Sequence, residues 1–492
     1  MKPMTETASL RRIETGVPGL DTILRGGLLQ GGVYLVEGSP GCGKTLCANQ
    51  ICFHRAGLGE NTVYVTLLAE SHTRMIAHLR GMQFFRSELA GTSVYYISAF
   101  KVLEANGLDG LVQTIQQSID QREASFLVLD GLVSAEEMAP SAREFKKFVH
   151  ELQTISGMTG CTIVLLASSE RPHRVRPEHT MVDGLIELGE TQVGAHSIRY
   201  IAVRKLRGAA QLRGRHALEI TIAGVRIRPR LETRLRGAEE LEPKTPQDVT
   251  LAAFGIPGLD AMLHGGLPRG SNTIVFGPSG SGKTLLCTQF LAAGVREQQR
   301  SLYLGFYERP AGLLDKDRRL GLGLAEARAQ GLLHLMWETP IEGVIDAVVD
   351  RLLEAVVQRE IQRVCFDGLH GFRHHAEYPD RTRALFTALA DELARRGVTS
   401  IFTLETSDLF GSRIELPIEG VSALAENLIL LRHVELRSRL HRVISILKLR
   451  DHDYDSSIRE FQITDRGVVV ADAFDSAERL LTGAAHVVPD PD

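Results

Sequence analysis

The sequence lacks three features that would each point to a particular class of protein. It has no basic excess, because 56 Lys and Arg residues stand against 60 Asp and Glu residues, whereas constitutive DNA-binding proteins usually show a basic excess or stripe. None of its six cysteines forms a Cys-x-x-Cys pair, which argues against a zinc ribbon. No apolar run approaches the roughly 20 residues of a membrane span, and the first residues carry no apolar signal core. We therefore expect a cytoplasmic protein with buried, reduced cysteines, no membrane partner and no dedicated nucleic-acid partner, although DNA held in the pore of a ring stays open.

The main feature that is present is an internal duplication. Of the 492 residues, 43% are apolar and 24% are charged, as in ordinary globular proteins with large cores. Residues 15–38 and 254–277 share the order Gly-x-Pro-Gly-Leu-Asp, Gly-Gly-Leu and a short apolar run. Three further pairs recur at nearly the same separation: Lys44 with Lys283 (239 residues), Asp130 with Asp367 (237 residues) and Lys205 with Lys448 (243 residues). A near-constant offset of this size indicates that a whole domain has been duplicated.

The junction between the two copies is predicted at residues 236–249. This stretch is charged, contains two prolines and has no apolar face, which is typical of a linker. We place the first domain at 1–240, the second domain at 241–480 and a flexible tail at 481–492.

Each copy alternates short apolar runs with helical patterns. Strands that are apolar throughout and separated by helices indicate a parallel sheet that is covered on both faces, and hence an α/β fold. The predicted strands of the first copy are 33–37, 61–68, 125–131 and 161–169, with helices at 45–57 and 143–157. The predicted strands of the second copy are 273–277, 301–306, 363–368 and 399–407.

Both copies contain a P-loop, Gly-x4-Gly-Lys-Thr, between a predicted strand and a predicted helix. Its glycines let backbone N–H groups converge on phosphate oxygens, and the following helix adds the positive end of its dipole. The lysines are predicted to reach the β- and γ-phosphates of ATP, and the threonines to ligate Mg²⁺. The two loops consist of Gly38, Ser39, Pro40, Gly41, Cys42, Gly43, Lys44 and Thr45, and of Gly277, Pro278, Ser279, Gly280, Ser281, Gly282, Lys283 and Thr284.

Acidic residues after later strands are predicted to complete each site. Asp130 and Asp367 end apolar strands, where an Asp of P-loop enzymes holds the Mg²⁺ shell. A carboxylate near the γ-phosphate would polarise the attacking nucleophile, and the candidates that follow the second strand are Glu70 and Glu308. These two glutamates do not align at the 239-residue offset, since Ala69 stands opposite Glu308.

Cations near the end of each copy form a further candidate site. Lys205 and Arg207 in the first copy, and Lys448 and Arg450 in the second, form Lys-x-Arg patterns that would point both cations to one face of a strand. In ring ATPases, such cations reach the γ-phosphate of a neighbouring subunit and stabilise its developing charge. A solvated basic strand face is the alternative interpretation. The histidines at 370, 374 and 375 lack defined metal-ligand partners and are interpreted as a polar loop.

Taken together, these residues resemble the KaiC family of double-domain ATPases. The resemblance covers about residues 13–480 and includes Gly16-Val17-Pro18-Gly19-Leu20-Asp21 with its repeat, both P-loops, both Lys-x-Arg patterns and the stretch 426–467. It implies two tandem RecA-like P-loop NTPase domains, each a mostly parallel twisted sheet flanked by helices. It also implies a homohexameric double ring with ATP and Mg²⁺ at subunit interfaces, slow hydrolysis in the first tier and serine/threonine autokinase activity in the second.

The sequence departs from the family pattern in three places. The family carries two adjacent glutamates after the second strand, whereas here Glu70 matches only the second position and Glu308 only the first. The phosphorylated Ser-Thr pair falls at Ser422-Ala423, so that Ser422 is the one remaining candidate. The short tail after residue 480 puts capture of a KaiA-type partner in doubt, while a KaiB-like partner stays possible.

Three functions are therefore compared. The first is a KaiC-like ATPase and autokinase that serves as a signalling switch or timer, circadian or otherwise. The second is a nucleotide-gated scaffold with little turnover, which the reduced glutamate pairs favour. The third is a RecA- or DnaB-type DNA motor, which the charge balance and the lack of a DNA-binding module argue against.

Overall fold

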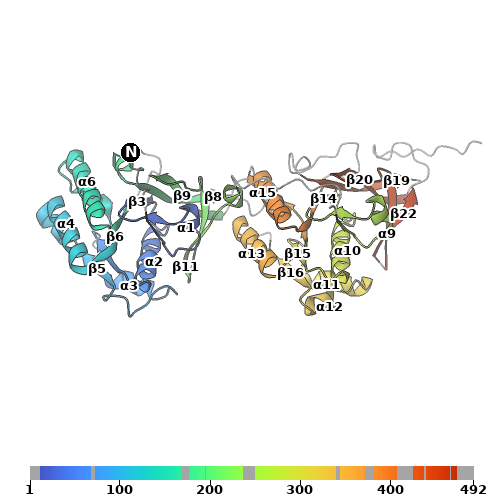
Figure 1. The fold of residues 1–492 in the computed structure, drawn as a ribbon, viewed down its shortest axis with the longest axis horizontal. Helices are drawn as coiled ribbons and strands as arrows, with labels where there is room; N and C mark the ends of the chain where they lie inside the picture. The colour runs from blue at the N-terminus through green and yellow to red at the C-terminus, as the bar shows by residue number, and fades with distance from the viewer. Residues whose placement is uncertain are drawn as a thin grey trace, which may run out of the picture. The chain divides into compact units, whose positions relative to one another are not determined.

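A computed structural model describes residues 11–67, 72–168, 177–193, 196–235, 250–339, 344–371, 381–406, 425–436, 439–465 and 467–473. The chain divides into two compact units, Met1–Arg234 and Leu235–Asp492 (Figure 1). No helix among the described residues is long and apolar enough to cross a membrane.

The first unit is built on a nine-stranded sheet with the order β11-β10-β9-β8-β3-β7-β6-β4-β5. The strands from β8 to β5 are parallel, and β9, β10 and β11 extend the sheet in antiparallel fashion. The strands of this sheet are β3 (Val33–Gly38), β4 (Asn61–Thr66), β5 (Val94–Ser98), β6 (Ala124–Asp130), β7 (Thr162–Ser168), β8 (Gly184–Val193), β9 (His196–Leu206), β10 (His216–Thr221) and β11 (Gly224–Arg228); β1 (Arg12–Ile13) and β2 (Leu28–Leu29) form a separate pair.

The helices of the first unit cover both faces of this sheet. They are α1 (Leu20–Ile23), α2 (Lys44–Gly57), α3 (His72–Leu79), α4 (Phe100–Arg122), α5 (Leu132–Glu137), α6 (Ala142–Thr159), α7 (Pro177–Met181) and α8 (Leu231–Arg234). Apolar residues of α1 and α2 pack in one core cluster, and those of α4, α5 and α6 pack in a second one across the strands. The bounds of α6 follow from its caps, because Ser141 accepts the Glu144 N–H and Gly160 ends the helix in the left-handed region.

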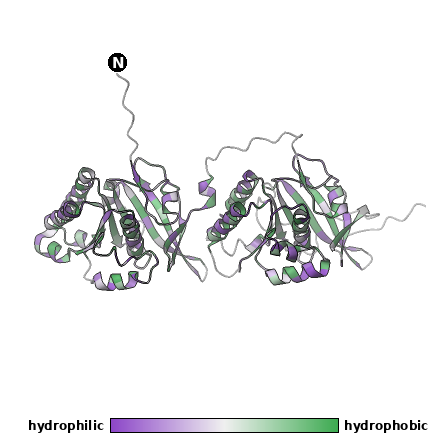
Figure 2. Cartoon of the chain, turned by 60° about the horizontal axis from the view of Figure 1, so that its bottom comes forward, coloured by the Kyte–Doolittle hydropathy of each residue, from purple (hydrophilic) through white to green (hydrophobic). Residues whose placement is uncertain are grey.

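The second unit repeats this architecture with the order β16-β15-β17-β18-β14-β19-β20-β21-β22. Its strands are β14 (Asn272–Gly277), β15 (Ser301–Gly305), β16 (Leu333–Trp337), β17 (Arg363–Asp367), β18 (Thr399–Glu405), β19 (Asn427–Leu436), β20 (Arg439–Leu449), β21 (Arg459–Thr464) and β22 (Gly467–Ala473), with β12 (Leu251–Ala252) and β13 (Leu267–Pro268) as a separate pair. Its helices are α9 (Pro257–Met262), α10 (Lys283–Arg296), α11 (Pro310–Leu320), α12 (Leu324–Ala329), α13 (Ile345–Gln358) and α15 (Arg381–Arg395). Figure 2 shows apolar residues concentrated on the strands of both units. Two mostly parallel nine-stranded sheets with flanking helices confirm the predicted fold class.

The antiparallel edge of each sheet is attached to the helix that follows the P-loop. In the first unit, the Gln50 side chain of α2 accepts the Val225 N–H (2.7 Å) and donates to the Val225 carbonyl (3.2 Å). In the second unit, the Gln289 side chain of α10 accepts the Val468 N–H (2.9 Å). We call this contact the glutamine clamp, and it holds the β10–β11 and β21–β22 hairpins beside the two P-loops.

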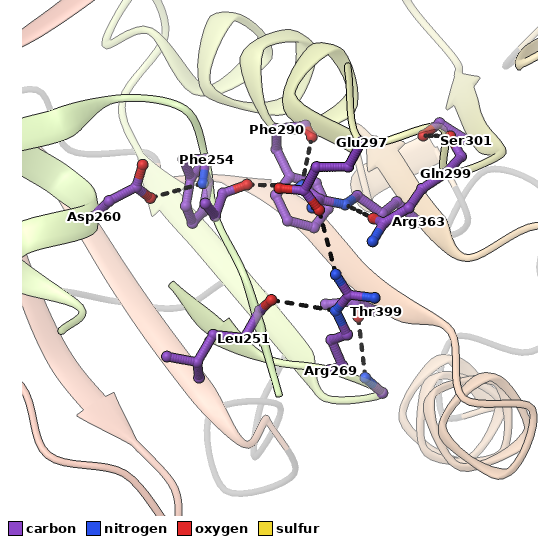
Figure 3. A network of polar contacts seen from close by, with 12 residues as sticks. Leu251, Phe254, Asp260, Arg269, Phe290, Glu297, Gln299, Ser301, Arg363 and Thr399 are labelled. Carbon is purple, nitrogen blue, oxygen red and sulfur yellow. Dashed lines mark hydrogen bonds and ion pairs between the residues drawn. The ribbon is translucent and has the colours of Figure 1, made fainter. Parts of the chain in front are cut away.

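A buried arginine network joins β17 to α10 in the second unit (Figure 3). Arg363 is 1% exposed, and its guanidinium donates to Gln299, to the Phe290 carbonyl and to Glu297. A Cβ at Gly294 would lie 2.6 Å from Arg363 Cδ, so the helix needs glycine at this point. All six cysteines are buried and free, as the sequence predicted, and burial raises the pKa of Cys161 to about 12.

Candidate nucleotide-binding sites

The P-loop glycines are required by the backbone conformation. In the first unit, Gly41 and Gly43 have φ angles of 81° and 103°, a left-handed region that L side chains rarely adopt. A Cβ at Gly43 would also lie 2.8 Å from Ile220 of the hairpin. Gly280 and Gly282 repeat these angles at 73° and 105°. Each loop is therefore a tight cradle of backbone N–H groups at a helix N-terminus.

The P-loop lysines fold over their own loops. Lys44 Nζ donates to the carbonyls of Gly38 (2.8 Å) and Ser39 (2.9 Å). Lys283 Nζ donates to the corresponding carbonyls of Gly277 (2.8 Å) and Pro278 (2.7 Å). Burial lowers the pKa of Lys283, and the nearby carboxylates of Glu405 and Asp367 oppose that shift. Each ammonium therefore stands at the mouth of its cradle, where phosphate oxygens would replace the carbonyls.

The structure brings each P-loop threonine to the predicted aspartate. Thr45 Oγ1 donates to Asp130 Oδ2 (3.1 Å), and Thr284 Oγ1 donates to Asp367 Oδ2 (2.7 Å). A hydroxyl and a carboxylate are oxygen donors of the kind that Mg²⁺ prefers. Burial raises the pKa of Asp130, although hydrogen bonds from Tyr64 and Thr45 and the charge of Lys44 oppose that shift.

Sequence reasoning missed the tyrosines that hold these aspartates. Tyr64 donates to Asp130 Oδ2 (2.6 Å) from β4, and Tyr303 donates to Asp367 Oδ2 (2.7 Å) from β15. These tyrosines are 239 residues apart, the same offset as the P-loop lysines, so a full alignment of the two copies would have found them. Thr403 was also missed: its hydroxyl donates to Asp367 Oδ1 (2.7 Å).

The cavities beside the two P-loops differ in size and lining. The cavity of the second unit has a volume of about 1250 Å³ and is lined by Lys283, Thr284, Glu308, Asp367 and Glu405 among others. The cavity of the first unit has a volume of about 300 Å³, and its described lining includes Thr45, His72 and Asp130. Sequence reasoning missed both Glu405 and His72, because neither belongs to a motif.

The structure describes one of the two candidate catalytic glutamates. Glu308 lies in the second cavity, and its carboxylate forms an ion pair of 2.6 Å with Lys316 of α11. Glu70 lies outside the described residues, as do Ser422, His374 and His375. His370 lines the second cavity, and the described residues contain no group of three His, Cys, Asp or Glu that could hold a metal ion.

Three of the Lys-x-Arg cations, Lys205, Arg207 and Lys448, donate to backbone carbonyls of their own unit. Lys205 Nζ donates to the carbonyls of His179 (3.0 Å), Thr180 (2.9 Å) and Val182 (2.7 Å) at the end of α7. The Arg207 guanidinium donates to the carbonyls of Thr180 and Met181. The prediction that both cations lie on a strand is wrong for the arginine, because the β9 strand ends at Leu206 before Arg207.

In the second unit, the arginine likewise lies after the end of its strand. Lys448 lies on β20 and donates to the Ala425 carbonyl (2.6 Å), whereas β20 ends at Leu449, so Arg450 follows the strand. In the first unit, Lys205 and Arg207 nevertheless both donate to the Thr180 carbonyl, so the two cations lie on the same side.

Comparison with known proteins agrees with this geometry. The sequence model of a family described as "ATPase: KaiC" matches the chain twice, over residues 13–232 and 252–474. Among curated proteins, the circadian clock oscillator protein KaiC of Rippkaea orientalis is 25% identical, over 98% of this chain and 93% of the relative. The proteins of the same name from Synechococcus elongatus (25%) and a Nostoc species (26%) are covered to the same extents, 98% of this chain and 93% of each relative. The two matches to the family, each spanning one of the two P-loop units, show that this chain belongs to the KaiC ATPase family.

Proposed function

We propose that this KaiC-family chain hydrolyses ATP at the interfaces between subunits of a homohexameric double ring. The observation that carries this proposal is the position of the Lys-x-Arg cations. The Arg207 N–H donates to the Asp183 carbonyl, and the Asp183 N–H donates to the Val33 carbonyl, so Arg207 is level with the start of β3. Gly38 ends β3, about 16 Å further along the strand at 3.3 Å per residue. We infer from this offset that a nucleotide contacted by Arg207 belongs to another subunit.

The residues of each P-loop site fit ATP with Mg²⁺. The cradle N–H groups and Lys44 or Lys283 would hold the phosphates, and Thr45 with Asp130, or Thr284 with Asp367, would hold the metal. When bound, Mg²⁺ would neutralise charge on the β- and γ-phosphates. Glu308, and Glu70 in the first unit, would polarise the nucleophile, while Lys205, Arg207, Lys448 and Arg450 would stabilise charge on a neighbour's γ-phosphate.

The second unit is proposed to phosphorylate the chain itself at Ser422. Support comes from its larger cavity and from relatives that are named circadian clock oscillator proteins. Such a cycle would make the chain a signalling switch or timer, in which the state of the γ-phosphate biases the contacts between subunits. A KaiB-like protein is the candidate partner for this role.

Incubation with γ-labelled ATP, followed by site mapping and native mass measurement, tests this function. We expect release of labelled phosphate, label on Ser422 and a mass of six chains. The absence of both turnover and label in a protein that binds ATP would leave the scaffold function.

The Lys44→Ala variant is expected to weaken hexamer assembly. Lys44 stands over the first cradle, so its loss would remove interface ATP from that tier. Size-exclusion chromatography with ATP should show smaller species, whereas Lys146→Ala, on the exposed side of α6, should elute as the wild type does. An intact Lys44→Ala hexamer with full ATP occupancy would contradict this expectation.

A further inference from the structure

Glu405 ends the strand next to the second P-loop strand. The strands β18 and β14 are parallel, and Glu405 stands opposite Gly277, the first residue of the P-loop. Ile401, Thr403 and Glu405 alternate along β18 and therefore share one face. That face is the α10 side, since Ile401 packs in the core cluster of α10 and Thr403 donates to Asp367. Glu405 is thus the next side chain beyond the proposed metal-binding Asp367, and it lines the same cavity.

The two glutamates of this cavity differ in their partners. The carboxylate of Glu308 is 18% exposed and is held by the Lys316 ammonium at 2.6 Å. Across the described part of the chain, no side chain forms a hydrogen bond or an ion pair with the carboxylate of Glu405. Its charge acts on the Lys283 ammonium and on the Tyr307 hydroxyl, both at the mouth of the cradle. Among the described residues, the exposed carboxylate of Glu405 therefore keeps free acceptor atoms in the cavity that Lys283 also lines.

We propose that Glu405 is the general base of the second unit and that it forms a functional carboxylate pair with Glu308. This inference rests on the proposed ATP hydrolysis. The sequence keeps only one of the two adjacent glutamates that the family carries after the second strand, which is Glu308. With Glu405, the site again has two carboxylates, and the additional one comes from β18. In the first unit, Ser168 occupies the equivalent position opposite Gly38, so no carboxylate stands there.

The step balances with water as the nucleophile. As the water oxygen bonds to the γ-phosphorus, one water proton passes to the Glu405 carboxylate. The bond between the γ-phosphorus and the bridging oxygen breaks, and its electron pair stays on ADP. Glu405 then returns the proton to solvent, while Glu308, fixed by Lys316, orients the water.

The Glu405→Gln variant of the full chain tests this role. The difference in ATP turnover between the wild type and Lys283→Ala gives the contribution of the second unit. We expect Glu405→Gln to lower that contribution by about 100-fold, within the range of a general base. ATP occupancy, measured with a fluorescent ATP analogue, should stay equal or increase, because the substitution removes a negative charge beside the phosphates.

Ser168→Ala is the matched control at the equivalent position of the first unit, and its total turnover should equal that of the wild type. A Glu405→Gln variant that keeps more than half of the contribution of the second unit would overturn the assignment. Equal ATP turnover in the wild type and in Lys283→Ala would also overturn it, because the second unit would then catalyse no hydrolysis. Absence of all turnover in the wild type would instead reject the proposed function itself.

Discussion

Asp130 and Asp367 end equivalent strands, yet their surroundings differ. Both accept hydrogen bonds from a P-loop threonine and a tyrosine. Asp367 also accepts one from Thr403 of the neighbouring strand, whereas Leu166 occupies the equivalent position in the first unit. Asp130 is 8% exposed, and burial is the main cause of its raised pKa. The fold therefore stabilises the charged form of Asp130 poorly.

Replacement of this carboxylate should stabilise the metal-free protein. A carboxyl whose pKa is higher in the folded state than in the unfolded state costs nothing below its unfolded value, and its cost grows as the pH rises through the folded value. Asp130→Asn should therefore raise the melting temperature of the first unit by about 2 °C or more at pH 7, and by less near pH 4. Calorimetry in EDTA without nucleotide checks this, and an unchanged difference at the two pH values would contradict it.

Individual functional residues could be predicted from the sequence where a motif fixes their spacing. The P-loops, Asp130 and Asp367 could be predicted because a strand end and a helix start place them. Glu405 could not be predicted, because its role depends on β18 lying next to β14, and strand order is not visible in one sequence. The assignment of Arg207 and Arg450 to a strand was wrong for a related reason, since pairing with neighbouring strands decides where β9 and β20 end.

At the scale of elements, the two units attach the P-loop helix to the sheet in different ways. In the first unit, Arg55 of α2 pairs with Glu60, which also accepts from Ser125 of β6. In the second unit, the position of Arg55 is taken by Gly294, and the guanidinium comes from Arg363 of β17 (Figure 3). The buried guanidinium thus comes from the helix in the first unit and from the strand in the second, where Gly294 leaves space for it.

Arg363→Ala should destabilise the second unit by about 3 kcal/mol, since it leaves a cavity and several buried polar groups without partners. Urea unfolding without nucleotide should show this loss in one transition while the transition of the first unit is unchanged. Arg300→Ala removes a largely exposed ion pair with Glu360 and should cost less than about 1 kcal/mol. Equal losses in the two variants would show that the network contributes little.

The strands and helices whose bounds were predicted from the sequence agree with the structure within two residues at each end, because apolar runs and caps are local signals. The helix expected at 45–57 is α2, and the strand expected at 399–407 is described as β18 up to Glu405. The antiparallel extension of each sheet was not predicted, because pairing between strands is set by tertiary contacts such as the glutamine clamp.

At the scale of the whole molecule, shared active sites predict complementation between subunits. A Lys283→Ala subunit has a defective second P-loop but keeps Arg450. An Arg450→Ala subunit lacks this arginine but keeps an intact second P-loop. Co-assembly of equal amounts should restore about a quarter of the turnover lost in either variant, because random neighbours in a ring pair an intact cradle with an intact cation at that frequency. Steady-state ATPase assays of the mixture measure this.

The control for this mixture replaces the Lys283→Ala subunit with one that carries Lys283→Ala and Arg450→Ala together. No interface of the control combines an intact cradle with an intact arginine, so the lost turnover should not return. Equal rates in the two mixtures would place Arg450 outside its neighbour's site.

The glutamine clamp has a mechanical consequence for such a ring. Gln50 ties the first phosphate-binding helix to β11, β11 pairs with β10, and β10 pairs with β9, which leads directly to Lys205 and Arg207. If α2 tilts when nucleotide binds, the strands β11, β10 and β9 must therefore move with it. In the proposed ring, nucleotide binding in one subunit would therefore displace the cations that this subunit presents to its neighbour.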